Sequence, residues 1–252
     1  ALAEGTRKAR AAILRRYVKA QGDRPLAEIA PEDIEAALRA KGGNAAVNEL
    51  KALRPVFAHA AALSIIPRDP TKGIEIARPA SRGFPTASAE EIAKFQARWP
   101  VGTPERLVFD LALYTGAARV DLARLGRHNL ADGLLTYKRR KSGVECNVPL
   151  TPELRAVIAR TPDIAPAFIL TSRGVPRTPA GLGNFFEKAA RAAGIEARLH
   201  GLRKAFCVYW AEKGTQTHQI AAMAGHLSLS EVARYTRAAD RRRMVKLLME
   251  SS

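Results

Sequence analysis

The stretch "RLHGLRKAFCVYWAEKG", residues 198–214, says more about the fold than any other part of the chain. Its apolar residues recur at i, i+3 and i+4, which predicts an amphipathic helix; they are Leu202, Ala205, Phe206, Tyr209 and Trp210. His200 and Arg203 are three residues apart, so they share one side of this helix on adjacent turns. They stand at its N-terminus, where free backbone N–H groups and the helix dipole favour an anion. The residues predict a phosphate cradle, with a histidine cap and a solvated arginine as the alternative.

The segment that follows, "HQIAAMAGHLSLSEVARYTRAAD", adds a second set of polar residues. A predicted helix stops at Gly225, a usual C-cap residue, and His226 comes directly after it. Ser228 and Glu231 form a capping box for the next helix, which carries Tyr235. Each feature alone has a structural explanation. Together, HxxR, then Gly-His, then a tyrosine nine residues beyond that histidine favour a phosphate site.

The composition narrows the class of partner. The 252 residues include 41 Lys and Arg against 24 Asp and Glu, a net charge of +17, which favours nucleic acid first and an anionic membrane second. No run approaches the ~18 apolar residues of a membrane span, and no signal peptide is visible. The two cysteines have neither zinc spacing nor a disulfide framework. We therefore expect a cytoplasmic, nucleoid-associated protein without metal or cofactor; its start at Ala1 predicts a missing upstream segment.

The chain divides at a linker. Residues 1–80 read as a helical domain with helices in 5–20, from Pro31, and after the N-cap Asn44. Pro55 is expected to bend or split the third helix. "RPASRGFPTAS", residues 78–88, has no periodicity, and we assign 81–87 as the linker. A capping box of Ser88 and Glu91 then opens the second domain, residues 88–252.

The second domain mixes helices with a few short strands. Helices are expected before and after Thr115-Gly116, from Thr151-Pro152, and over 181–193. Segments 134–137 and 144–150 flank a basic turn and predict a β-hairpin, with "FILTS", residues 168–172, as a third strand. The fold class is mainly α with a small β-sheet.

At this point the motifs resemble a known family. "HGLRKAF", "AGHLSLSEVARYT" and "LYTGAARVDLARL" are similar to motifs of the tyrosine recombinases, the phage-type integrases. The resemblance implies a helical core DNA-binding domain in residues 1–80 and an α+β catalytic domain in 88–252. It implies a site-specific recombinase that cleaves and rejoins DNA through a 3′-phosphotyrosyl intermediate, without ATP. The implied partners are a double-stranded recombination site and further copies of the chain, as a tetramer on paired sites.

The same resemblance implies a role for each candidate catalytic residue. Tyr235 matches the nucleophile, and Arg203 matches the second catalytic arginine, which holds the non-bridging phosphate oxygens. His200 matches the position that assists proton transfer, and His226 the one that hydrogen-bonds the phosphate. Lys141, in the turn "RRKSG", matches the lysine that protonates the leaving 5′-hydroxyl, with a plain backbone phosphate contact as its alternative.

Further basic residues are candidates for contacts to the DNA backbone, because Lys and Arg neutralise phosphates without reading sequence. Those in the first domain are Arg7, Lys8, Arg10, Arg15 and Arg16, and those in the second are Arg139, Arg140 and Lys204.

The turn "TGAARVDLARL" departs from the family pattern of Thr-Gly, any residue, then arginine, with an acidic residue three further on. Thr115, Gly116 and Asp121 match, and the position of the first catalytic arginine then holds Ala118. Arg119 is one residue late, a rotation of ~100° on a helix. Either the turn is altered so that Arg119 serves, or the site lacks this arginine. The register favours a missing arginine and weakened catalysis.

Other functions are compatible with parts of the pattern. A DNA-binding protein that never cuts and a type IB topoisomerase share the basic charge or the cleavage chemistry. An RNA-binding protein is disfavoured by the ordered motifs. The C-terminal stretch "RRRMVKLLMESS" has apolar residues on one side and docks either on a neighbouring subunit or on its own domain.

Overall fold

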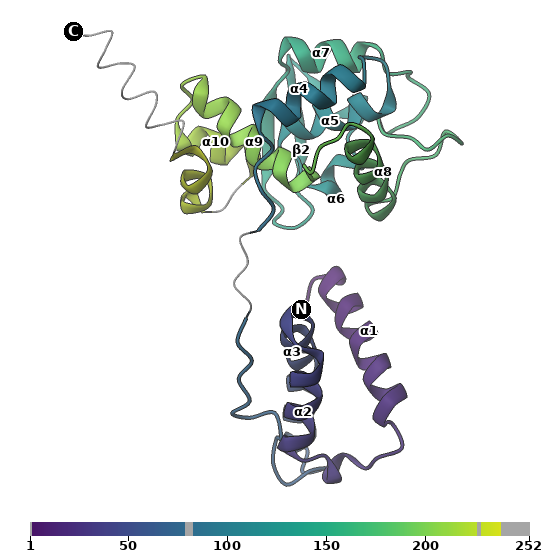
Figure 1. Ribbon diagram of the computed structural model, residues 1–252, viewed down its shortest axis with the longest axis vertical. Coiled ribbons are helices and arrows are strands. Elements are labelled where there is room, and N and C mark those ends of the chain that lie inside the picture. Colours follow the sequence, from purple (N-terminus) through teal and green to yellow (C-terminus); the bar gives the residue numbers. More distant parts are fainter. Residues whose placement is uncertain (1, 79–82, 226–227, 238–252) are drawn as a thin grey trace, which may run out of the picture. The chain divides into compact units, whose positions relative to one another are not determined.

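The computed structural model describes residues 2–78, 83–225 and 228–237 (Figure 1). Contacts between residues divide the chain into two compact units, with the boundary between residues 82 and 83. Each unit has its own cluster of buried apolar side chains.

The first unit consists of α1 (Glu4–Gln21), the short 3-10 helix η1 (Leu26–Glu28), α2 (Pro31–Lys41) and α3 (Gly43–Ala62). Both α1 and α2 pack on α3, whose Leu50, Leu53 and Phe57 lie in the core. The expected Asn44 cap is wrong, because α3 is capped by Gly42, which also ends α2 in a conformation with φ 63°. Pro55 does not split α3, since the helix is held by buried residues on both sides of the proline.

The second unit opens with α4 (Ala89–Arg98), α5 (Pro104–Thr115) and α6 (Arg119–Leu122). The predicted capping box is confirmed. Ser88 Oγ accepts from the Glu91 N–H at 3.1 Å, and the Glu91 carboxylate accepts from the Ser88 N–H at 3.1 Å. The later helices are α7 (Pro152–Ala159), α8 (Pro179–Ala192), α9 (Leu199–Glu212) and α10 (Thr217–Ala224), and residues 229–237 are helical.

A small antiparallel sheet lies between α6 and α7 in the sequence. After the 3-10 helix η2 (Arg127–Asn129), its strands are β1 (Leu130–Ala131), β2 (Leu134–Lys138) and β3 (Glu145–Pro149), in that order. The predicted hairpin is confirmed as β2 and β3. The predicted strand at 168–172 is not part of this sheet and is reduced to a single antiparallel β-bridge between Leu170 and Pro176. This segment folds back on itself, since the Thr171 N–H donates to Val175 and the Arg177 N–H to Ile169.

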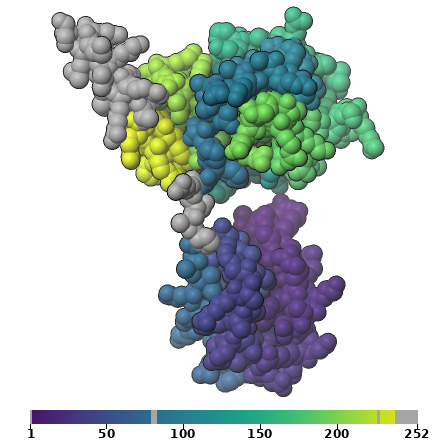
Figure 2. Space-filling model, viewed as in Figure 1, coloured from purple at the N-terminus to yellow at the C-terminus, as the bar shows by residue number. Residues whose placement is uncertain are grey.

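The core of the second unit surrounds α5, which is buried from Leu107 to Thr115 and packs against α7, α8 and α9. Phe95 of α4, Phe109 of α5 and Phe186 of α8 stack on one another. On the face shown in Figure 2, α4 and α8 cover this core. None of the helices in the described part of the chain has the length and hydropathy that a membrane span needs.

Candidate active site

Arg203 of α9 joins three parts of the second unit. Its side chain is buried, with 5% exposed. Nη1 donates to the carbonyl of Gly116 after α5, and Nη2 donates to the carbonyl of Ala224 at the end of α10, at 2.7 Å. Burial and the charge of Arg139 lower the pKa of Arg203, but a guanidinium stays protonated in proteins. The predicted phosphate ligand is therefore also a cross-link of the fold.

Two glycines make this cross-link possible. Gly116 ends α5 with φ 60°, and a Cβ there would lie 2.6 Å from the Cδ1 atom of Phe206. Gly225 ends α10 with φ 62°, and a Cβ there would lie 2.5 Å from the Cys146 sulfur. Both positions need a left-handed backbone and the absence of a side chain, which explains glycine in each motif.

The hairpin brings a second arginine to the same place. Arg139, at the end of β2, donates from Nη1 to the Gly225 carbonyl, and its charge acts on Arg203. The carboxylate of Asp121 in α6 accepts from the Arg140 N–H at 2.8 Å, which fixes the start of the turn. Lys141 is exposed two residues beyond Arg139 in this turn. In the sequence Asp121 only sets the register of its motif, and no local sequence signal predicts its hydrogen bond to the Arg140 N–H.

His200 stands in the first turn of α9 with an exposed side chain. Its ring meets the edge of Phe84, with 6.0 Å between the ring centroids. Partial desolvation of the ring, together with the charges of Lys204 and Arg203, lowers the pKa of His200. The imidazole is consequently neutral at neutral pH and can accept a proton.

Tyr235 lies against the same helix. Lys204 Nζ is 5.2 Å from the centre of the Tyr235 ring, and the guanidinium carbon of Arg234 is 5.7 Å from it. The Lys204 ammonium also donates to the carbonyl of Phe84. The predicted nucleophile is thus half-buried beside two cations, and one of them, Lys204, lies one turn after His200 on α9. His226, the remaining candidate, lies outside the described residues.

A cavity of about 610 Å³ opens between α6, α8 and the start of α9. Ala118, Arg119, His200 and Arg203 all line it, so the structure brings both halves of the predicted phosphate site to one hollow. Phe84 also lines this cavity. The sequence motifs predict neither the contact between the rings of Phe84 and His200 nor the direction in which the Arg119 side chain runs.

The other candidate DNA contacts belong to the first unit. Helix α1 has no buried residue, and Arg7, Lys8, Arg15 and Arg16 are exposed. Lys8 pairs with Glu4 at 2.7 Å. Arg10 is half-buried and lines a hollow of about 620 Å³ together with basic residues of α3 and of the loop after it, namely Lys51, Arg54 and Lys72.

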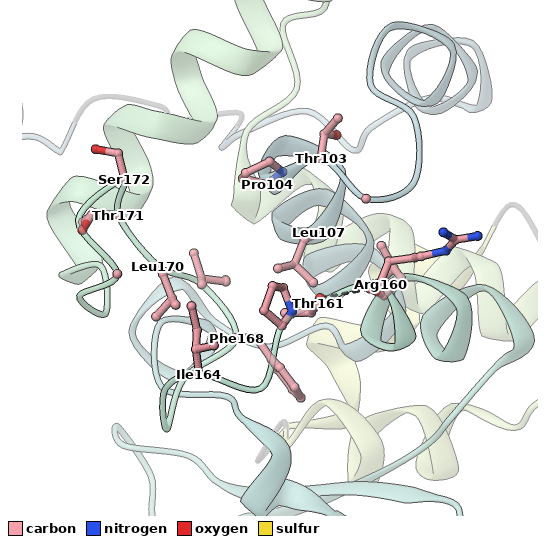
Figure 3. Close-up of a pocket in the computed structure, with 15 residues that line it drawn as sticks. Thr103, Pro104, Leu107, Arg160, Thr161, Ile164, Phe168, Leu170, Thr171 and Ser172 are labelled. Atoms are coloured by element: carbon pink, nitrogen blue, oxygen red, sulfur yellow. Dashed lines mark hydrogen bonds between the residues drawn. The ribbon is translucent and has the colours of Figure 1, made fainter.

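A separate cavity of about 270 Å³ lies between α5, α7 and the loop after α7 (Figure 3). Leu107, Phe168 and Leu170 are among its lining residues, and the guanidinium of Arg160 points away from it (Figure 3). It shares no lining residue with the cavity at Arg203, so it is not part of the candidate site.

A model of the phage integrase family matches residues 84–242, which is more than half of the chain. The chain belongs to the phage integrase family. The family match includes α9, the hairpin turn and Tyr235, which are the elements that build the candidate site.

Individual relatives agree with the family match. The chain is 27% identical to the integrase of Escherichia phage HK022 over 84% of its own length and 64% of that protein. It is 29% identical to the tyrosine recombinase XerA of Pyrococcus furiosus over 53% of its own length and 50% of that protein. The chain thus spans less than two thirds of each of these relatives.

Solved structures show the same fold. A lambda integrase dimer (residues 75–356 of that protein) bound to a COC′ core site superposes with a TM-score of 0.78 at 22% identity, over 93% of this chain and 89% of that one. A lambda integrase tetramer bound to a Holliday junction superposes with a TM-score of 0.79 at 21% identity, over 93% of this chain and 72% of that one.

Proposed function

We propose that this chain is a site-specific DNA recombinase that cleaves and rejoins duplex DNA through a 3′-phosphotyrosyl intermediate. The observation that carries the proposal is the geometry of α9. This helix holds His200 and Arg203 at the cavity, and its Lys204 contacts the ring of Tyr235. Lambda integrase, which shares the fold, is bound to a DNA core site in its solved structure.

The proposed reaction is an in-line displacement at phosphorus. The hydroxyl oxygen of Tyr235 attacks, the bond from phosphorus to the 5′-oxygen breaks, and its electron pair leaves on that oxygen. Neutral His200 is suited to accept the tyrosine proton, and Lys141 would protonate the leaving oxygen. Arg203 and His226 would donate to the non-bridging oxygens, where negative charge grows. The phosphotyrosyl bond keeps the energy of the phosphodiester, so resealing needs no ATP.

The DNA partner follows from charge and from the family. In this proposal residues 1–80 form the core-binding domain and residues 88–252 the catalytic domain. The basic residues of α1 and Arg140 of the hairpin would contact phosphates. Because lambda integrase forms a tetramer on a Holliday junction, we also propose that four copies act on paired sites. Association with the nucleoid follows from this DNA partner.

The test is the covalent adduct. Duplexes that bind the protein are enriched from a randomised pool, and the enriched duplex is then synthesised with a nick beside the cut, so that cleavage becomes irreversible. The wild-type chain should form a protein–DNA adduct that survives SDS and disappears on proteolysis. Tyr235→Phe should abolish the adduct and leave affinity nearly unchanged, because the ring can still pack. An adduct that persists in this variant would mean that another residue attacks.

Two other functions are distinguished from recombination by the adduct assay and by a plasmid relaxation assay. A protein that only binds DNA would show affinity without an adduct. This outcome is worth testing because Ala118 stands where the family pattern has a catalytic arginine. A type IB topoisomerase would relax a supercoiled plasmid without paired sites.

A further inference from the structure

We infer that Arg119, laid along the open face of Gly183 in α8, donates to the scissile phosphate in place of the arginine that position 118 lacks. This inference rests on the proposed recombinase function and names an additional catalytic residue for it. The register of the motif alone favours a missing arginine, whereas the cavity favours Arg119.

The path of the Arg119 side chain is defined by Gly183. A Cβ on Gly183 would lie 2.7 Å from Arg119 Nη1, 3.3 Å from Cδ and 3.6 Å from Cζ. The whole outer half of the arginine therefore runs against the surface that the missing side chain leaves open. The positions are 64 residues apart in the sequence, and no local pattern connects them.

This path keeps Arg119 in the cavity. Ala118 is the N-cap of α6 in an extended conformation, and Arg119 is the first residue of that helix. Both line the cavity together with His200 and Arg203. Because Ala118 is extended and lies outside the helix, the rotation of ~100° per residue of a helix does not separate the two positions, and Arg119 lines the hollow at which the first arginine is expected.

No carboxylate in the part of the chain that the structure describes forms an ion pair with Arg119. Glu187 lines the same cavity, and its Oε1 pairs with Arg198 at 3.4 Å and with Arg191 at 3.5 Å. Among the described residues, no acidic side chain lies within ion-pair distance of Arg119, whose side chain is exposed. An exposed guanidinium at the wall of a cavity with a neutral histidine fits an oxyanion better than a structural ion pair.

The first experiment measures the rate of adduct formation on the nicked duplex described above. Arg119→Ala should lower this rate by roughly 10²–10³-fold, the usual cost of one lost oxyanion donor, and change affinity by only a few fold. Arg119→Lys should recover part of the rate, because it keeps the charge but loses the planar fork. The matched control is Arg124→Ala, which removes the same charge from an exposed residue that does not line the cavity and should change neither quantity.

The second experiment distinguishes an effect on the position of the Arg119 side chain from an effect on the stability of the fold. Gly183→Ala should raise the propensity of α8 for helix, so thermal stability should be equal or higher, yet the added methyl displaces Arg119 and should lower the adduct rate. That loss should vanish when Arg119 is already alanine, as a double-mutant cycle measures. Gly181→Ala adds the same methyl to the same helix, where its nearest neighbour is the hydroxyl of Thr178, and should leave the rate unchanged.

The outcomes distinguish this inference from the proposed function. If the wild-type chain forms a Tyr235-dependent adduct and Arg119→Ala is as active, the function stands and the inference is overturned. It is also overturned if the Gly183→Ala loss persists without Arg119, or if Ala118→Arg raises the rate by 10²–10³-fold. If the wild-type chain and Ala118→Arg both form no adduct, the proposed function fails and the inference falls with it.

Discussion

Gly116→Ala is expected to destabilise the second unit far more than an ordinary glycine substitution. The left-handed backbone at φ 60° costs a residue with a Cβ about 1–2 kcal/mol. The new Cβ would also lie 2.6 Å from Cδ1 and 2.8 Å from Cγ of the Phe206 ring, a side chain that is fully buried. Relieving such a clash in a packed core costs about 1–3 kcal/mol. The expected loss in free energy of unfolding is about 2–5 kcal/mol.

Gly194 supplies the matched control. It has a similar φ of 66°, and a Cβ there would meet no atom within 4 Å. Gly194→Ala should therefore show the backbone cost alone, about 1–2 kcal/mol. The difference between the two variants isolates the clash with Phe206.

The assay is urea unfolding followed by tryptophan fluorescence. Both tryptophans of the chain, Trp99 and Trp210, lie in the second unit, so the signal reports the unfolding of this unit. Gly116→Ala could instead lower the free energy of unfolding by no more than Gly194→Ala does. In that case the Phe206 ring does not exclude a side chain at position 116, and the structural explanation of the Thr-Gly motif is wrong.

Three further predictions concern DNA binding and cleavage. Affinity for duplex DNA should fall by on the order of 10³-fold or more between low and moderate salt, because several phosphates are neutralised; titrations that show no salt dependence would exclude the proposed backbone contacts. Chelators should not change the rate of adduct formation, since the proposed donors are the side chains of Lys141, His200 and Arg203; a strict need for Mg²⁺ would contradict this donor set. The pKa of His200 is lowered from 6.5, so the adduct rate should hold from pH 8 down to its ordinary value of 6.5 and fall in more acidic buffer, where the imidazole is protonated. A pH–rate profile whose inflection lies above 6.5 would remove His200 as the proton acceptor.

Local signals predicted the second unit well where the structure depends on neighbours in sequence. The capping box of Ser88 and Glu91 and the C-cap at Gly225 are contacts within a few residues, and the β2–β3 hairpin joins two consecutive strands across one turn. Each has a recognisable sequence pattern. The HxxR spacing likewise placed His200 and Arg203 at one end of a helix.

The sequence was less informative where distant segments meet. The strand expected at 168–172 pairs within its own loop, because Thr171 and Val175 bond across a tight turn, and periodicity does not reveal a pairing partner. The Asn44 cap was displaced because Gly42 ends one helix and begins the next. The approach of Arg119 to Gly183 and the hydrogen bond from Arg139 to Gly225 join residues that are far apart in the sequence, so no local pattern predicts them.

The two carbonyls that Arg203 holds bear on which residues a decaying copy of such a gene would lose first. A lineage that no longer cuts DNA is free to change its tyrosine, but it keeps this arginine for as long as it needs a folded protein, since two distant carbonyls depend on the guanidinium. Retention of the arginine in a relative therefore says little about activity. For the same reason, in the proposed mechanism a catalytically silent chain made to capture its DNA target is best altered at Tyr235, because this change removes the attacking hydroxyl and leaves the contacts of Arg203 in place.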